Sequence, residues 1–284
     1  MSVWQAIVLG IVQGLTEFLP VSSSAHLIVV PWLLGWASPG LAFDAALHLG
    51  TLAAVIVYFW RDLLGMALAL PCALRRPGSV LRSRDPADLM PRLALLIAIG
   101  TLPGAVIGLV AEDLIDAAYH PAGVTPDRVI VAVAIALMAL ALLLLLAERS
   151  ARHVRRMESL RARDALIIGL AQAGALIPGV SRSGSTITAG LFRGLARADA
   201  ARFSFLLGSP IVAAAGAKGL LDLVTSGVDA GQLGVFAFGL ASSAIAGFAA
   251  IWGLLRYLQR ASTFVFIAYR IALGLALLVL VVVR

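Results

Sequence analysis

The sequence is short of the residues on which soluble and disulfide-framed proteins depend. It has one cysteine, Cys72, one lysine, Lys218, and only 13% of its 284 residues are charged. A single cysteine permits no internal disulfide and no thiolate metal cluster. A folded globule needs polar cover, so a charged fraction well below the usual ~25% excludes a soluble domain. Intrinsic disorder and a disulfide-framed secreted module are excluded as well.

Motifs of several enzymes that handle phosphate are also missing. A Cys-x5-Arg loop would need an arginine where the chain has Gly78, and a Lys-x6-Arg-Pro pattern would need a lysine where it has Ala69. There is no Asp-x-Asp pair and no Walker loop, so we do not expect ATP-driven transport. No basic residue precedes the first apolar stretch, so we expect no cleaved signal peptide.

Apolar residues dominate instead, at 61% of the chain, with a mean hydropathy of +0.99. A helix that spans a bilayer needs ~20 mostly apolar residues. Six segments meet this requirement: 41–60, 93–111, 129–147, 203–221, 233–255 and 264–283. The sequence therefore predicts an all-α integral membrane protein with six transmembrane helices.

Two further apolar segments, 2–35 and 164–192, are each interrupted by a polar cluster. The clusters are Pro20-Val21-Ser22-Ser23-Ser24 and Pro178-Gly179-Val180-Ser181-Arg182-Ser183-Gly184. Pro and Gly interrupt helices, and irregular backbone at membrane depth persists only inside protein or beside a water-filled cavity. We predict two re-entrant helical hairpins, each made of two half-helices that meet at a polar tip.

The arginines predict the orientation of the chain. The net charge is +7, and 17 of the 21 arginines fall within 61–92, 148–163, 193–202 and 256–260. The alternate loops carry acidic residues: Glu112, Asp113, Asp116, Asp127, Asp222 and Asp229. Arginine-rich loops stay in the cytoplasm, so the basic excess is a topology signal and does not indicate a nucleic-acid partner. Both termini are predicted outside, with the first hairpin entering from outside and the second from inside.

The two hairpin sequences match each other at a shift of 159 positions. The matched pairs are Gly10 with Gly169, Gln13 with Gln172, Val21 with Val180, Ser22 with Ser181, and Ser24 with Ser183. Two copies that enter from opposite faces form an inverted-topology repeat, a plan common in transporters. We predict one membrane domain, 1–284. Repeat copies cover about 1–112 and about 160–255, with extra spans at about 129–147 and 264–283.

Glu17 is the first candidate for chemistry. It lies in an apolar run four residues after Gln13, so the two side chains share a helix face. Ionisable groups inside a membrane are costly, and function is therefore the default hypothesis. A carboxylate satisfied by backbone amides near the helix end is the structural alternative.

A cluster of hydroxyls and an imidazole follows the first break: Ser22, Ser23, Ser24 and His26. These groups fit a nucleophile, a base and an anion-binding set at a half-helix junction. Serine caps with a snorkelling histidine are the alternative. Glu17 and His26 lie on opposite arms of the hairpin and can face one another.

Arg182 occupies the second tip. A guanidinium matches phosphate bidentately, and Gly179 and Gly184 let backbone amides approach an anion. Hydroxyl groups surround it: Ser181, Ser183, Ser185 and Thr186. A structural salt bridge between Arg182 and Glu17 is the alternative.

Three other polar residues are weaker candidates, and we expect no role for His120, which falls in a predicted loop. Asp44 and His48 share one face of the first span, and Arg270 lies in the last span. For these three, structural pairing is at least as consistent with the sequence as function. His153 lies in a loop, and we expect no role for it.

At these residues the sequence resembles the bacterial undecaprenyl-pyrophosphate phosphatase family, the bacitracin-resistance membrane phosphatases. The family's first motif, Glu/Gln-x3-Glu followed by Pro-Val-Ser-Ser and His, corresponds to residues 13–26. Its second motif, Pro-Gly-x-Ser-Arg-Ser-Gly, corresponds to residues 178–184. The chain has Gln13 for the first acid, Ser24 where Thr is common, and Ala25 for a Gly. None of these departures removes a catalytic group.

The resemblance implies hydrolysis of undecaprenyl pyrophosphate to undecaprenyl phosphate and inorganic phosphate. This reaction recycles the lipid carrier for peptidoglycan synthesis and confers bacitracin resistance. The resemblance marks Glu17, Ser23, His26 and Arg182 as catalytic. It marks as substrate-binding Ser22, Ser24, Ser181, Ser183, Thr186, Gly179 and Gly184. It also implies a divalent cation, Mg²⁺ or Ca²⁺, with Glu17 and Gln13 as expected ligands.

Several alternatives stay open at this point. The nucleophile is Ser23, His26 or an activated water. A transporter or flippase of the lipid carrier is the alternative function, because inverted repeats are common among transporters. The expected location is the bacterial inner membrane, with the site facing the periplasm. A homodimer is one alternative for the oligomeric state, since nearly every predicted span has a Gly/Ala-rich face.

Overall fold

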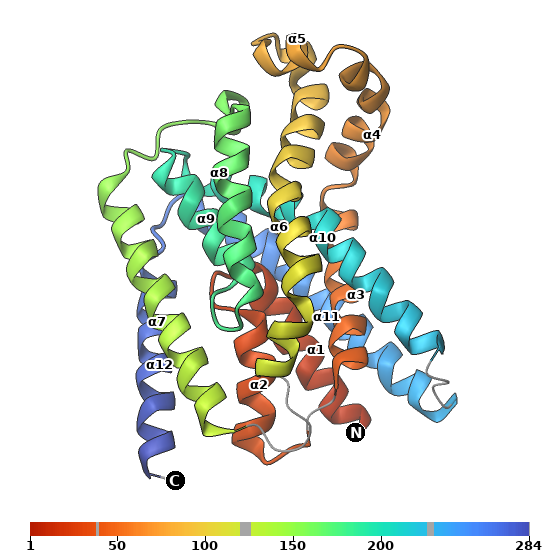
Figure 1. Cartoon of the computed structure of the whole chain (residues 1–284), viewed down its shortest axis with the longest axis vertical. Coiled ribbons are helices and arrows are strands. Elements are labelled where there is room, and N and C mark those ends of the chain that lie inside the picture. The colour runs from red at the N-terminus through yellow and green to blue at the C-terminus, as the bar shows by residue number, and fades with distance from the viewer. Residues whose placement is uncertain (38–39, 120–125, 226–229, 284) are drawn as a thin grey trace.

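The computed structural model describes residues 1–284 apart from 38–39, 120–125, 226–229 and 284, and the described residues form a helical bundle (Figure 1). Its α-helices are α1 (Val3–Phe18), α2 (Ser23–Leu34), α3 (Leu41–Tyr58), α4 (Trp60–Arg75), α5 (Pro77–Arg82), α6 (Leu89–Tyr119), α7 (Asp127–Ser150), α8 (Ala162–Ala173), α9 (Arg182–Phe192), α10 (Arg197–Thr225), α11 (Ala230–Leu258) and α12 (Phe264–Val283). Three short 3₁₀ turns join them: η1 (Pro86–Asp88), η2 (Met157–Ser159) and η3 (Gly174–Leu176). The prediction of an all-α fold is confirmed.

In the part of the chain that the structure describes, five helices are long and apolar enough to cross a membrane, within α6, α7, α10, α11 and α12. A sixth span results if Ala46–Tyr58 and Trp60–Arg75, which are bent by 82°, are counted together. All six predicted spans coincide with helices, and the chain is a multi-pass membrane protein.

The arginine-rich segment 61–92 differs from the expectation of a loop. It forms α4, α5, η1 and the first turn of α6. Leu, Ala, Met and Arg are all strong helix formers, so charge does not prevent a helix here. A search for uninterrupted apolar runs misses such a helix because arginines flank it.

Both predicted interruptions are present, and they share an unusual backbone conformation. Ser22 has φ 79° and Ser181 has φ 73°, a region that non-glycine residues rarely adopt. Each is the N-cap of the helix that follows, and its hydroxyl accepts a hydrogen bond from the amide of Ala25 or Gly184. The two breaks are therefore built in the same way, at positions 159 residues apart.

Glycines let the interrupted helices approach their neighbours closely. A β-carbon at Gly10 of α1 would lie 2.4 Å from the carbonyl oxygen of Gly239 in α11. A β-carbon at Gly169 of α8 would lie 2.1 Å from the carbonyl oxygen of Gly100 in α6. Small residues at such contacts are typical of membrane helix packing. Each interrupted segment thus packs against one long helix.

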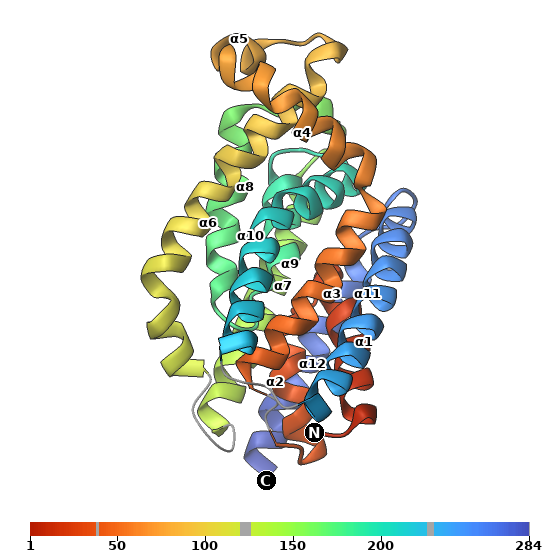
Figure 2. The ribbon, with the colours of Figure 1, turned by 90° about the vertical axis from the view of Figure 1, so that its right-hand side faces the viewer.

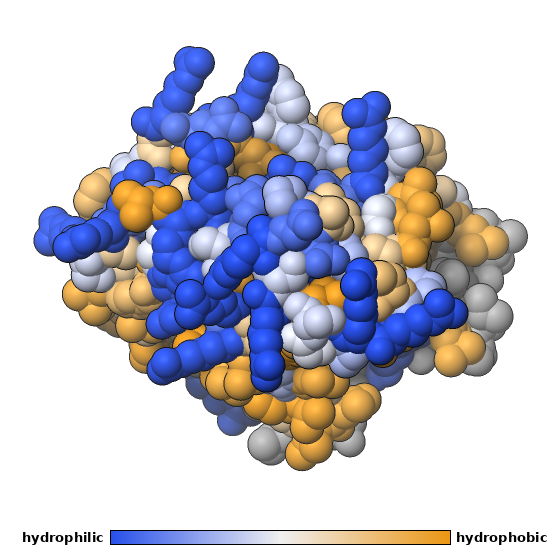
Figure 3. All heavy atoms as spheres, turned by 90° about the horizontal axis from the view of Figure 1, so that it is seen from above, coloured by the Kyte–Doolittle hydropathy of each residue, from blue (hydrophilic) through white to orange (hydrophobic). Residues whose placement is uncertain are grey.

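The two ends of the molecule differ in charge. Both termini lie at the lower end in Figures 1 and 2, and hydrophilic side chains gather on the opposite face (Figure 3). Exposed arginines of the segments at that face include Arg75, Arg76, Arg82, Arg84, Arg149, Arg152, Arg156, Arg161 and Arg163. His120 and Asp229 lie outside the described residues, as do the side chains of Glu112, Asp113, Asp116 and Asp222.

An ionic network holds the base of the second interrupted segment at the arginine-rich end. The buried carboxylate of Asp164 accepts hydrogen bonds from Arg155 Nη2 at 2.8 Å and from Arg193 Nε at 2.7 Å. Burial alone would raise the pKa of Asp164, but these hydrogen bonds hold that pKa below its usual range. The network joins the start of α8, the end of α9 and the 151–161 connection.

Candidate active site

Glu17 is the centre of the candidate site. It lies in the last turn of α1, with 6% of its side chain exposed. Its Oε1 accepts from Arg182 Nη2 at 3.0 Å, and its Oε2 accepts from Ser23 Oγ at 2.6 Å and from Gln13 Nε2 at 3.2 Å. The structure therefore brings four of the predicted site residues, from α1, α2 and α9, into one cluster.

Ser23 and Arg182 occupy equivalent places in the two tips. Each is the first residue of its helix and directly follows one of the two positive-φ serines. The same local backbone thus directs a hydroxyl at one oxygen of Glu17 and a guanidinium at the other. Strained backbone of this kind costs about 1–3 kcal/mol per residue and is concentrated at functional sites.

Arg182 is tightly enclosed but keeps hydrogen-bonding capacity. Its side chain is 12% exposed, its Nε and Nη2 donate to Glu17, and its Nη1 donates to the carbonyl oxygen of Ser204. These contacts use three of the five N–H groups of a guanidinium. The salt bridge given as the structural alternative is formed, and it leaves donors available for an anion.

Gly208 of α10 makes room for this guanidinium. A β-carbon at Gly208 would lie 1.5 Å from Arg182 Nη1 and 2.3 Å from Arg182 Cζ. No real side chain tolerates that distance, so glycine is required here for Arg182 to take its place. The sequence marks Gly208 only as the counterpart of Gly50 in the internal repeat, at a shift of 158 positions, and it gives no signal for Ser204.

The other predicted hydroxyls mostly hold the tips together. Ser24 Oγ accepts from the amide of Gly179 at 3.4 Å, and Ser183 Oγ donates to the carbonyl oxygen of Leu19 at 3.2 Å. Both contacts join one tip to the other. Further hydroxyl pairs lie within 3.3 Å, namely Ser22 with Ser24, Ser181 with Ser183, and Thr186 with Ser204.

His26 is engaged away from Glu17. Its Nδ1 lies 2.6 Å from the carbonyl oxygen of Ser22, which can only accept, so Nδ1 carries the proton. Its Nε2 lies 2.6 Å from the hydroxyl of Tyr269 on α12, and the neutral ring accepts from that hydroxyl. The composition of the last span gives no signal for Tyr269, since a tyrosine in a span is common.

Arg270 of α12 is hydrogen-bonded to the backbone of both tips. It is fully buried, and its guanidinium donates to the carbonyl oxygens of Pro20 at 3.1 Å, Gly179 at 2.9 Å and Leu137 at 3.0 Å. The structural role expected for Arg270 is therefore confirmed. The residue is also part of the site, because it contacts the backbone of both tips. A buried guanidinium satisfied by carbonyls of both breaks fixes their relative position.

Gln13 and Glu17 can supply only some of the ligands that a divalent cation needs. Among the described residues no group of three His, Cys, Asp or Glu is placed to hold a metal ion. Gln13 Oε1 is buried and has no hydrogen-bond partner among them, which leaves one amide oxygen free beside one carboxylate. Mg²⁺ often binds through one or two carboxylates together with substrate phosphates. The donor set fits a cation whose coordination the substrate completes.

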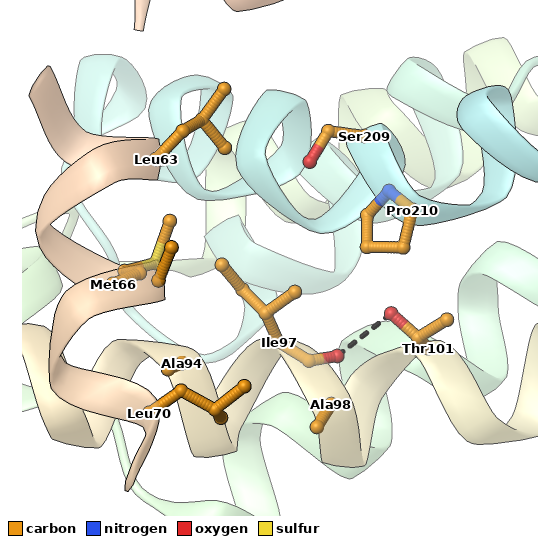
Figure 4. A pocket seen from close by; sticks show the side chains of 10 residues that line it. Leu63, Met66, Leu70, Ala94, Ile97, Ala98, Thr101, Ser209 and Pro210 are labelled. Atoms are coloured by element: carbon orange, nitrogen blue, oxygen red, sulfur yellow. Dashed lines mark hydrogen bonds between the residues drawn. The ribbon is translucent and has the colours of Figure 1, made fainter. Parts of the chain in front are cut away.

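A separate apolar cavity of about 390 Å³ lies between α4, α6 and α10 (Figure 4). Its lining residues are Leu63, Met66, Ala67, Leu70, Ala94, Ile97, Ala98, Thr101, Ser209 and Pro210. The polar groups there have local roles, since Thr101 Oγ1 donates to the carbonyl oxygen of Ile97. None of the predicted site residues lines this cavity.

The fold and the site together define a class: a multi-pass helical membrane protein whose acid, hydroxyl and guanidinium meet where two apolar segments are interrupted. Residues 6–276 match the family described as bacitracin resistance protein BacA, and the chain belongs to that family. The family expected from the two motifs is confirmed.

Curated relatives are similar over their whole length. The chain is 54% identical to the undecaprenyl-diphosphatase of Thermomicrobium roseum over 281 residues, which cover 99% of each chain. It is 44% identical to the undecaprenyl-diphosphatase of Desulforudis audaxviator, with full coverage of both. The undecaprenyl-diphosphatase of Synechococcus elongatus is 47% identical over 96% of this chain and 91% of its own.

Proposed function

We propose that this protein hydrolyses undecaprenyl diphosphate to undecaprenyl phosphate and inorganic phosphate. The observation that carries the proposal is the convergence of Ser23 and Arg182 on the two oxygens of Glu17. Relatives that match end to end carry the name of this activity. The reaction returns the lipid carrier to peptidoglycan synthesis and confers bacitracin resistance.

Ser23 is the nucleophile in this proposal. Its hydroxyl already donates to Glu17 Oε2 at 2.6 Å, so the carboxylate is positioned to accept the proton as Ser23 Oγ attacks the terminal phosphorus. The bridging P–O bond breaks in this step, and undecaprenyl phosphate leaves. Water then hydrolyses the phosphoserine, which releases inorganic phosphate and restores the Ser23 hydroxyl. His26 is a less favourable nucleophile in this arrangement because both of its ring nitrogens are engaged. Water remains the alternative, and trapping of a phosphorylated Ser23 distinguishes the two routes.

Arg182 neutralises charge on the phosphoryl group that is transferred. Phosphoryl transfer depends on positioning and on stabilising charge at the equatorial oxygens. The two N–H groups of Arg182 that are left over from its protein contacts are available for this purpose. Ser22, Ser24, Ser181, Ser183, Thr186, Gly179 and Gly184 remain the predicted substrate-binding set, with Ser23, Ser24 and Arg182 the least enclosed of the polar side chains at the tips.

A divalent cation, Mg²⁺ or Ca²⁺, is part of the proposal. Gln13 Oε1 and the carboxylate of Glu17 would hold it, together with oxygens of the diphosphate. Bound there, it would add Lewis-acid stabilisation of phosphate charge. Support comes from the free, buried amide oxygen of Gln13.

We also propose that the two interrupted segments are re-entrant hairpins and form an inverted repeat. Helices α1, α2, α8 and α9 have 16, 12, 12 and 11 residues, so each is shorter than the ~20 residues that span a bilayer. The segments begin at opposite ends of the molecule and meet at Arg270 (Figures 1 and 2). The matched caps at Ser22 and Ser181 support a common origin.

The decisive experiment is phosphate release by the purified full chain in detergent. Undecaprenyl diphosphate and farnesyl diphosphate are supplied with Mg²⁺ or with EDTA. We expect release from the long substrate, and a large loss in EDTA that added Mg²⁺ restores. No release under any condition would refute the proposed activity, and equal release in EDTA would refute the cation.

A transporter or flippase of the lipid carrier is the second function considered. The proposed inverted repeat is the observation that favours it. Movement of a labelled carrier across liposomes by a Ser23→Ala variant would support transport. Hydrolysis by purified protein without a gradient supports the enzyme. The mass of the same purified sample in detergent distinguishes a homodimer from the other oligomeric states.

A further inference from the structure

His26 has a counterpart in the second tip. At the shift of 159 positions that relates the two tips, His26 corresponds to Ser185. Each of these residues lies four positions after a positive-φ serine, so its side chain can return along the helix to the carbonyl group of that serine. His26 Nδ1 donates to the carbonyl oxygen of Ser22 at 2.6 Å. Ser185 Oγ donates to the carbonyl oxygen of Ser181 at 2.8 Å. The same backbone group is therefore bonded in both tips, by an imidazole in one and by a hydroxyl in the other.

The carbonyl group that His26 bonds belongs to the strained residue of the first tip. Ser22 has φ 79°, and it directly precedes Ser23, whose hydroxyl contacts Glu17. The backbone amide of His26 also donates to the Ser22 carbonyl oxygen, at 3.3 Å, so His26 holds this oxygen with two groups. Strained backbone persists only where the surrounding contacts over-determine it. His26 thus stabilises the conformation that directs Ser23 toward the carboxylate.

Tyr269 of α12 holds the imidazole from outside the hairpin. Unlike a serine hydroxyl, an imidazole has a second polar atom, and here Tyr269 Oη donates to His26 Nε2 at 2.6 Å. The two rings also stack, with centroids 5.7 Å apart and planes 9° apart. The hydrogen bond at one ring nitrogen sets which nitrogen carries the proton, so this contact keeps the proton on Nδ1, toward Ser22. Arg270, the next residue of α12, donates to the carbonyl oxygen of Pro20, so α12 supports the first tip at two points.

We propose that His26 and Tyr269 are positioning residues, which hold the first tip in the conformation that directs Ser23 toward Glu17. This proposal rests on the proposed function, and it replaces the catalytic role that the resemblance implies for His26. Ser185 supports it, because the corresponding position of the second tip makes the same contact with a buried hydroxyl. What an imidazole and a hydroxyl share at this position is a donor for the carbonyl group, and that donor is what the tip requires.

The experiment compares four variants of the full-length protein in detergent. His26→Ala removes both contacts of the ring, and His26→Ser introduces the donor that the second tip uses. Tyr269→Phe removes only the hydroxyl. Tyr257→Phe in α11 is the matched control, since that ring packs on Phe266 and its hydroxyl has no hydrogen bond among the described residues. The readouts are kcat and KM for undecaprenyl diphosphate, and hydrogen–deuterium exchange at the amides of residues 22–26.

We expect His26→Ala to lower kcat about 100-fold, because a shift of about 1 Å at the nucleophile is enough for that loss. Tyr269→Phe should lower kcat about tenfold, which corresponds to the loss of one hydrogen bond. His26→Ser should be at least about tenfold faster than His26→Ala, because a serine in a helix donates to the carbonyl four residues before it. KM should change less than about threefold in all four variants, since neither positioning side chain touches the substrate. Amide exchange should be faster than in the wild type in His26→Ala and Tyr269→Phe, and close to it in His26→Ser and Tyr257→Phe.

Equal loss of turnover in His26→Ser and His26→Ala would assign the imidazole to the chemistry and overturn the proposal. Wild-type turnover and exchange in Tyr269→Phe would also overturn it. A raised KM with unchanged kcat in His26→Ala would place His26 at the substrate, with the same consequence. If the wild type released no phosphate, the proposed function would fail, and amide exchange in the four variants would still decide whether His26 and Tyr269 hold the tip.

Discussion

Glu17 is the residue on which both tips depend. One of its carboxylate oxygens accepts a hydrogen bond from the hydroxyl of Ser23, and the other accepts from the guanidinium of Arg182. A buried carboxylate is costly unless it is paired and hydrogen-bonded, and here it has both kinds of partner. The same contacts that make the charge tolerable also place a nucleophile beside an anion-binding group.

Replacing Ser23 tests this arrangement most directly. We expect Ser23→Ala to reduce phosphate release at least about 1,000-fold, since it removes the group in contact with the proposed base. Ser24→Ala is the matched neighbour, and its effect should be much smaller because Ser24 bonds to the amide of Gly179 instead. Near-normal turnover of Ser23→Ala, Glu17→Ala and Arg182→Ala would refute the site.

Gly208→Ala tests the fit of the guanidinium. The added methyl would displace Arg182, and a misplacement of about 1 Å can reduce a rate about 100-fold. Gly253→Ala in α11 is the control, because a β-carbon there meets nothing within 4 Å. We expect loss of turnover only in Gly208→Ala, with both proteins folded. Wild-type turnover in Gly208→Ala would contradict the packing described here.

The sequence predicts some of these residues and not others for a physical reason. Glu17 and Arg182 are identifiable because an ionisable group in an apolar segment has a large cost. Their contact joins positions 165 residues apart, and spacing along one helix says nothing about such a pair. Gly208 carries no signal of its own, since its role depends on a side chain from another helix.

At the scale of elements, the second interrupted segment is anchored at its base. Asp164 at the start of α8 and Arg193 after α9 are tied together, and both are tied to Arg155. We expect Asp164→Asn to cost about 2 kcal/mol, the value of charge-assisted hydrogen bonds, and to lower the thermal midpoint by about 5 °C. Asp127→Asn, at an exposed position, is the control and should leave the midpoint unchanged.

The same network gives this anchor a defined pH dependence. The pKa of Asp164 in the folded protein lies below its usual range, so its contribution is complete at neutral pH. This contribution begins to decline below about pH 4, where the carboxyl of the unfolded chain becomes protonated, and it is lost as the pH falls through the lower pKa of the folded protein. In thermal scans the difference in midpoint between wild type and Asp164→Asn should therefore narrow progressively below about pH 4, and a constant difference would contradict the assignment.

Element positions follow from the sequence wherever apolar runs are continuous. All six predicted spans are helices, and both breaks fall at the predicted Pro/Gly/Ser clusters. Helix α4 was missed because its arginines, at Arg61 and Arg75, resemble a loop by composition. After the 82° bend that precedes it, α4 packs against α6, a contact that no local pattern reveals.

At the scale of the molecule, the separation of charge predicts its topology. The arginine-rich face and the two termini lie at opposite ends (Figures 1 and 3). With Cys72 replaced by Ala, we expect Ser2→Cys to react with an impermeant maleimide in intact cells. Ser79→Cys should react only after permeabilisation, because arginine-rich ends stay in the cytoplasm. The reverse pattern would contradict the orientation.

The equivalent positions of Ser23 and Arg182 have an evolutionary consequence. If the two halves arose by duplication, the ancestor was a half-length chain with one kind of tip, and its assembly would have brought two identical tips together. Two serines lack an anion-binding cation, and two arginines lack a nucleophile. The divergence of one position, Ser23 in one copy and Arg182 in the other, would then have been the event that made the fused chain an enzyme.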